Sequence, residues 1–258
     1  MIRIKNILLA IALVLLFNLP SFSQKKADLI NTRWAFNPVV ADGELKDWPD
    51  SLTMFNEETN LYYGLANDDK NVYLAIRSAS NQDLTKILAG GISFSANIEG
   101  KKKNAPTVIF PVLDRTPGKS RNNSEQADAE ERQRQILSRI KDIRVAGFKE
   151  IIDGAISMQN TYGIRAAASF DKNNNLVQEI IIPLSLLNLS AGNSGEVTYS
   201  IRVNGLQAPP VAANQRQTSQ RQPMGGMYGN QFPPRNSSIS KLLTSSQFFI
   251  RSRLATKQ

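Results

Sequence analysis

The stretch "VVADGELKDWPD", residues 39–50, holds four acidic side chains, one glycine and one of the two tryptophans of the chain. The acids could supply oxygen ligands for calcium, because hard cations accept irregular sets of carboxylates and carbonyls. The ring of Trp48 could instead stack on the C–H face of a sugar. In a third interpretation, Asp42 and Gly43 form a turn that leaves the first strand, and Trp48 folds back into the core, as large rings usually do. The surrounding sequence favours this third interpretation.

Short alternating runs of apolar and polar residues, separated by turn signals, dominate the chain. The run "VYLAIRS" (72–78) and the preceding residues 61–68 predict a hairpin, and residues 162–170 and 176–184 predict another around "DKNNN". Further strands are expected at 91–100, 106–112, 195–205 and 246–254. The total of about nine to eleven strands is too many for one open sheet without curling or splitting. The sequence therefore predicts an all-β protein, a β-sandwich formed by the single domain 24–258.

One amphipathic helix is expected to interrupt the strands at residues 124–143, "SEQADAEERQRQILSRIKDI". It is acidic at its start and basic at its end, as the helix dipole prefers. An apolar stripe at helical spacing is formed by Ile136, Leu137, Ile140 and Ile143. We expect this stripe to pack over an edge or end of the sandwich, with partner binding as the alternative.

A second interruption is the segment 207–238, which is long, polar and rich in Pro, Gly and Gln. Segments of this composition cannot bury enough apolar surface to fold. We expect a disordered low-complexity loop, inserted before the last strand.

The first 23 residues have the features of a secretory signal peptide. Arg3 and Lys5 precede the apolar run "ILLAIALVLLF" (7–17), and small residues precede an expected cleavage site before Gln24. At about 1.5 Å per residue, this run is too short to cross a hydrocarbon core of roughly 30 Å. The chain is thus expected to be exported and soluble, in the periplasm or outside the cell, without a membrane span.

The composition argues against catalysis, because the chain contains no histidine and no cysteine. Catalytic triads, Cys–His pairs and His-ligated zinc or haem all need one of these residues. Proton transfer near neutral pH also loses its usual side chain. We therefore expect a protein that is not an enzyme and has no catalytic residues.

The formal net charge of +9 is unevenly distributed. From residue 197 onward there are eight Lys or Arg and no Asp or Glu, so the basic character belongs to the C-terminal quarter. Nucleic acid is the usual partner of a basic protein, but export and the scattering of these charges argue against it. Glycans or envelope proteins are the expected partners.

Several segments resemble, in order along the chain, family 9 carbohydrate-binding modules and the related DOMON-like domains, in a secreted Bacteroidota branch of that superfamily. The segments are "VVADGELKDW", "NVYLAIR", "GISFSANIEGKKK", "EIIIPLSLL", "IRVNGLQ" and "SSQFFIRSRLA". The resemblance implies a sandwich of jelly-roll or immunoglobulin-like topology. It also implies that sugar ends are held between aromatic rings and that calcium supports the fold. Calcium is therefore a possible ligand. No other cofactor is expected, since haem-binding relatives use Met and His ligands and this chain has no histidine.

The resemblance assigns structural roles to Asp42, Gly43 and Trp48, which match the family motif. Candidate ligand-binding aromatics are Trp34, Tyr62 and Tyr63, although no tryptophan after residue 48 can act as a second clamp. We thus expect an exported, non-catalytic protein that binds a carbohydrate or another ligand. The alternative is a cell-envelope scaffold or interaction protein that uses the basic segment 207–241 and the inserted helix.

Overall fold

The computed structural model describes residues 29–48, 52–98, 105–113, 129–190, 192, 195–206 and 242–257. The expected signal peptide, the expected loop 207–238 and residues 124–128 of the expected helix lie outside them.

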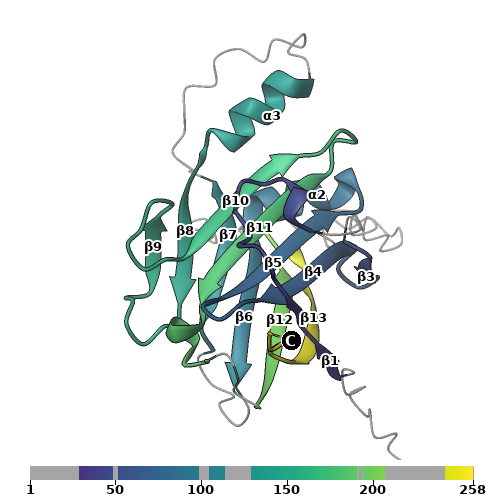
Figure 1. Cartoon of the computed structure of the whole chain (residues 1–258). Coiled ribbons are helices and arrows are strands. Elements are labelled where there is room, and N and C mark those ends of the chain that lie inside the picture. Colours follow the sequence, from purple (N-terminus) through teal and green to yellow (C-terminus); the bar gives the residue numbers. More distant parts are fainter. Residues whose placement is uncertain are drawn as a thin grey trace, which may run out of the picture.

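Two sheets pack face to face, which confirms the all-β sandwich (Figure 1). Sheet A has the strand order β1 (Leu29–Asn31), β13 (Ser246–Arg253), β12 (Glu196–Val203), β6 (Ile92–Ile98), β7 (Thr107–Leu113), β8 (Ile140–Ala146), β9 (Gly154–Ser157). Sheet B has the order β10 (Arg165–Phe170), β11 (Leu176–Pro183), β5 (Asn71–Ser78), β4 (Leu61–Asn67), β2 (Arg33–Trp34), with β3 (Met54–Asn56) also on β4. Among these pairs, β1–β13 and β2–β4 are parallel and the rest antiparallel.

The main core lies between the sheets and follows the alternation of side chains along each strand. In β6, Ile92 and Phe94 are fully buried while Ser93 and Ser95 face outward. In β12, Tyr199 points inward and stacks on Phe94, with 5.6 Å between ring centroids. The same period of two that predicted the strands therefore also sorts the residues between core and surface.

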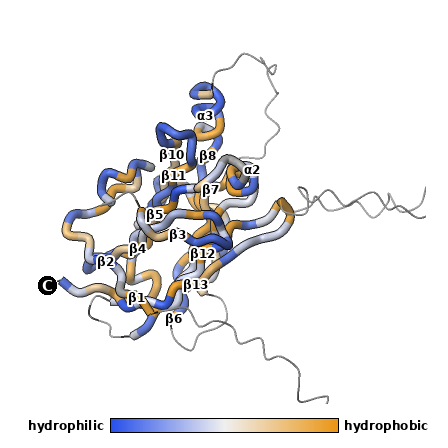
Figure 2. Tube along the Cα trace, turned by 90° about the vertical axis from the view of Figure 1, so that its right-hand side faces the viewer, coloured by the Kyte–Doolittle hydropathy of each residue, from blue (hydrophilic) through white to orange (hydrophobic). Residues whose placement is uncertain are grey.

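The expected helix 124–143 is wrong for residues 138–143. The helix α3 spans Ala129–Leu137, and Ile140 and Ile143 belong to strand β8. Ile143 is fully buried between the sheets, and pairing with β7 provides hydrogen bonds for the backbone of β8. Tertiary pairing thus outweighs a weak helical pattern. The remaining helix projects at one end of the sandwich (Figures 1 and 2); it has no fully buried residue, but Ile136 packs, partly buried, against the main core.

Further elements were not expected from the sequence. The helix α2 spans Asn81–Gly90, and short 3-10 turns occur at Leu45–Asp47 and Leu184–Leu187. The described strands number thirteen instead of nine to eleven, because β1, β2, β3 and β9 are only two to four residues long. In the described part of the chain, neither α2 nor α3 has the length and hydropathy that a membrane crossing would require.

Candidate functional site

The outer face of sheet B is covered by the chain itself. Residues 35–48 lie across it. Together with Leu52 and four residues of sheet B they form a second apolar cluster, separate from the core between the sheets: Ala35, Val39, Trp48, Leu52, Ala66, Tyr73, Ala75 and Ile181. Trp48 is only 5% exposed in this cluster. Its ring lies against Gly64 of β4, where a Cβ atom would come within 2.8 Å of the ring. Trp48 is therefore buried on the outside of the sandwich, not between its two sheets.

A buried carboxylate attaches residues 35–48, which we call the cover, to β11. Glu179 is 1% exposed, and its Oε1 accepts a hydrogen bond from the indole Nε1–H of Trp48 at 2.9 Å. Its Oε2 accepts from the backbone N–H groups of Gly43 at 2.9 Å and Asp42 at 3.1 Å. Burial raises the pKa of the Glu179 carboxyl, and the three donors oppose this rise without cancelling it. One side chain thus connects both halves of the motif to the sheet.

Where the structure describes them, the acidic side chains of residues 39–50 accept hydrogen bonds from donors in the same turn. Asp42 accepts from the backbone of Glu44 at 2.8 Å and from the amine of Lys46, and Asp47 accepts from the backbone of Val40 at 3.0 Å. The side-chain hydrogen bond from Lys46 lowers the pKa of Asp42. No group of three potential metal-binding acids occurs among the described residues.

Gly43 is needed for the close approach of this turn to β10. Its φ is +84°, a region that side chains disfavour. A Cβ atom there would lie 3.0 Å from atoms of Ala168 and Ser169. The hydroxyl of Ser169 donates to the carbonyl of Gly43 at 2.6 Å. Asp42, Gly43 and Trp48 all serve contacts between the cover and sheet B.

The structure does not bring the three candidate aromatics together. Trp34 pairs with Asn67 at one end of β4, and Tyr62 lies five positions earlier, about 16 Å away along the strand. Tyr63 points into the core, where its ring lies 4.9 Å from that of Phe248. The three rings cannot form one platform for a sugar.

Tyr62 instead belongs to a small row at the edge of the cover. The ring of Phe55 lies 4.8 Å from that of Tyr62, and the guanidinium of Arg77 lies 4.6 Å from the Tyr62 centroid on its other side in the sheet. Phe55 is 43% exposed. Phe55 and Arg77 were not among the residues selected from the sequence, because their adjacency depends on strand pairing.

The outer face of sheet A carries no such apolar cover among the described residues. At its centre, small hydroxyl side chains from two adjacent strands lie side by side, a set we call the hydroxyl band: Ser93, Ser95, Thr198 and Ser200. All four are partly exposed. Ser95 pairs with Ser200, and Thr107 of β7 extends the same row. The Ser93 hydroxyl already exchanges hydrogen bonds with the side chain of Asn204, at 3.1 Å and 2.9 Å, whereas the hydroxyl groups of Ser95, Thr198 and Ser200 can donate to and accept from a ligand.

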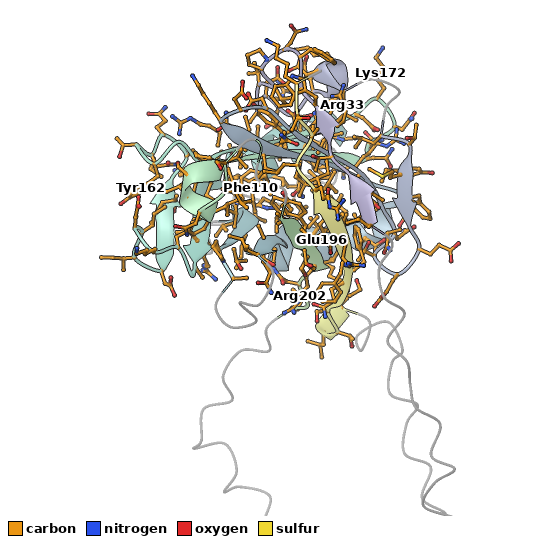
Figure 3. The ribbon with its side chains drawn as sticks, turned by 60° about the horizontal axis from the view of Figure 1, so that its bottom comes forward. Arg33, Phe110, Tyr162, Lys172, Glu196 and Arg202 are labelled. Carbon is orange, nitrogen blue, oxygen red and sulfur yellow. The ribbon has the colours of Figure 1, made fainter. Side chains whose placement is uncertain are left out.

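Longer side chains border the hydroxyl band on both sides. On β13, Phe249 pairs with Ser200 and is 51% exposed. On β12 itself, Arg202 is exposed and donates from Nε to Gln247 at 2.8 Å. Across the sheet, Arg144 of β8 is exposed and pairs with Ile109 of β7. In Figure 3, Arg33 of sheet B lies near the top, whereas Arg202 of sheet A lies near the bottom. The guanidinium of Arg33 lies over the ring of Trp48.

The sequence contained part of the signal for this surface. The alternating strands predict that the serines of "ISFSANI" and the Thr and Ser of "VTYSIRV" face away from the core. Nothing in the sequence indicates that these two strands and "SQFFIRSR" are neighbours, because more than 90 residues separate Ile98 from Glu196. The surface is visible only once the strand order is known.

Comparison with known proteins gives no match: no family model, no curated protein and no solved structure is significantly similar to this chain.

Proposed function

We propose that this protein binds an extended glycan on the open face of sheet A, without catalysing a reaction. The observation that carries the proposal is the hydroxyl band bordered by the half-exposed ring of Phe249. Sugars present hydroxyl groups that need both donors and acceptors, and C–H faces that pack on aromatic rings. The hydroxyl band meets the first requirement and Phe249 meets the second.

The rest of the chain is consistent with a binding role. The absence of histidine and cysteine removes the usual catalytic groups. The N-terminal 23 residues have the features of a signal peptide, so the proposed place of action is the periplasm or the exterior, where polysaccharides occur. The resemblance to family 9 carbohydrate-binding modules agrees with the ligand class, although the surface proposed here differs from an aromatic clamp.

A titration against a panel of polysaccharides by calorimetry tests the proposal, with Phe249→Ala as the diagnostic variant. The variant should weaken binding by about 1–2 kcal/mol, because a half-exposed ring loses its contact area with the sugar. Phe36→Ala is the matched control, since Phe36 is 76% exposed and belongs to the segment that covers sheet B. Equal affinity of both variants would move the site away from sheet A, and no binding to any glycan would refute the proposal.

The alternative is an envelope interaction protein, and α3 is the observation that favours it. The helix projects from the sandwich, has no buried residue and contacts the hairpin after β10 through a 2.8 Å hydrogen bond from Gln133 to Asn174. Only Ile136 of this helix packs against the main core, and most of its other side chains are exposed, so the helix offers a largely polar surface to a partner. A partner protein that binds the wild type but not a Glu130→Lys, Arg134→Glu variant would support this alternative.

A further inference from the structure

Among the described residues, the outer face of sheet A carries more positive than negative side chains. Three arginines lie on β12 and β13, namely Arg202, Arg251 and Arg253, and Arg144 lies on β8. The acids that face outward on these strands are Glu196 and Asp142. The face therefore has a net positive charge, whereas the hydroxyl band at its centre is uncharged.

The single acid on β12 is already engaged. Glu196 contacts the guanidinium of Arg251 directly and that of Arg253 at 3.6 Å. Its side chain is only 22% exposed, so this pair is partly withdrawn from solvent. Within the described residues, Arg202 and Arg144 have no acidic partner. The guanidinium of Arg144 and the Nη groups of Arg202, whose Nε donates to Gln247, are therefore available to a ligand.

The two guanidiniums border one row of the sheet. The pairs Arg202–Ser93, Ser93–Ile109 and Ile109–Arg144 run across four neighbouring strands. At about 4.8 Å per strand, Arg202 and Arg144 lie roughly 14 Å apart, with Ser93 of the hydroxyl band between them. A chain lying across the strands would meet a cation at each end of this row.

We infer that the glycan bound by this face is acidic and carries carboxylate or sulfate groups. This inference rests on the proposed function and specifies its ligand class. Guanidinium groups match such anions, since they offer two parallel N–H donors to a pair of oxygens. Ser95, Thr198 and Ser200 of the hydroxyl band bind the sugar hydroxyls, and Arg202 and Arg144 bind the acid groups on either side.

Binding to three soluble polymers tests the inference: polygalacturonate, a neutral galactan of similar length and polyglutamate. Polygalacturonate should bind at least about tenfold more tightly than either of the others, and raising the salt from about 50 mM to about 500 mM should weaken it. Equal binding of the galactan overturns the acidic ligand and leaves the proposed glycan function standing. Equal binding of polyglutamate overturns the saccharide, and no binding of either saccharide overturns the proposed function as well.

Variants that each remove one charge test where on sheet A the glycan binds. Arg202→Gln and Arg144→Gln should each weaken polygalacturonate binding at least about fivefold, with little effect on folding, because both side chains are exposed. Arg202→Lys keeps the charge but loses the two-pronged geometry, so it should restore only part of the affinity. Lys172→Gln is the matched control on the hairpin between β10 and β11 of sheet B (Figure 3). An equal loss in Lys172→Gln would show a general charge effect and overturn the assignment to this row.

Discussion

The carboxylate of Glu179 gives the sharpest test of how the N-terminal cover is held. In Glu179→Gln, the amide has one acceptor oxygen where the carboxylate has two. That oxygen can remain on the backbone N–H groups of Asp42 and Gly43, but the new NH₂ group then faces the indole N–H of Trp48. Two donors meet at a position that is almost completely buried.

The expected cost is that of a buried donor without a partner, about 1–3 kcal/mol. With a urea m-value of about 2 kcal/mol/M for a domain of this size, the unfolding midpoint should fall by about 1 M. Far-UV circular dichroism is the suitable signal, because it does not depend on either tryptophan. Glu58→Gln is the control, since Glu58 is exposed in the turn between β3 and β4, and its midpoint should change little.

A double-mutant cycle with Trp48→Phe separates the specific contact from general damage. The phenylalanine ring fills most of the same space but has no N–H group to oppose the NH₂ group that Glu179→Gln introduces. The double variant should therefore be about 1–2 kcal/mol more stable than the sum of the single effects indicates. Additive effects, or a Glu179→Gln protein as stable as the wild type, would refute the proposed role of this carboxylate.

Three further predictions concern the same fold. Burial raises the pKa of Glu179 in the folded state, so its contribution to stability is present below its unfolded pKa and is lost as pH rises through the folded pKa. Lowering the pH from about 7 to about 4 should therefore stabilise the wild type relative to Glu179→Gln. A difference in urea midpoint between the two proteins that is the same at both pH values would show that this is wrong. Gly64→Ala should cost about 1–3 kcal/mol and increase the exposure of Trp48 to fluorescence quenchers, since the new methyl group would lie 2.8 Å from the ring; an unchanged midpoint would mean that the cover does not press on β4. Ile143→Ala should cost about 2–5 kcal/mol because Ile143 is fully buried in β8, whereas Ile152→Ala, at a side chain that is 92% exposed, should have almost no effect on thermal unfolding; equal effects would contradict the strand assignment.

The sequence was sufficient for the class of fold but not for the neighbours of each strand. Alternation in residues 72–78 and 195–205 predicted strands that the structure contains as β5 and β12. The same reasoning failed at Ile140 and Ile143, where two isoleucines three positions apart fit a helix equally well and the pairing with β7 decides. Local pattern cannot express a contact made with a distant strand.

The candidate site shows the same limit in its chemistry. Trp34, Tyr62 and Tyr63 were selected because aromatic rings mark sugar-binding sites, but strand register separates the first two and the pleat turns Tyr63 inward. Serines are common on exposed strand faces, so Ser95 and Ser200 carried no signal by themselves. Their significance comes from lying opposite each other, which only the pairing of β6 with β12 provides.

Glycan binding on sheet A is tested most directly by mapping amide chemical shifts in the isotope-labelled protein as oligogalacturonate is added. Glycan binding at the hydroxyl band should produce changes concentrated on the outer face of sheet A, at Ser95, Ser200 and Phe249 and their neighbours in the sheet. Changes confined to sheet B, around Phe55 and Tyr62, with β6 and β12 unaffected, would contradict it.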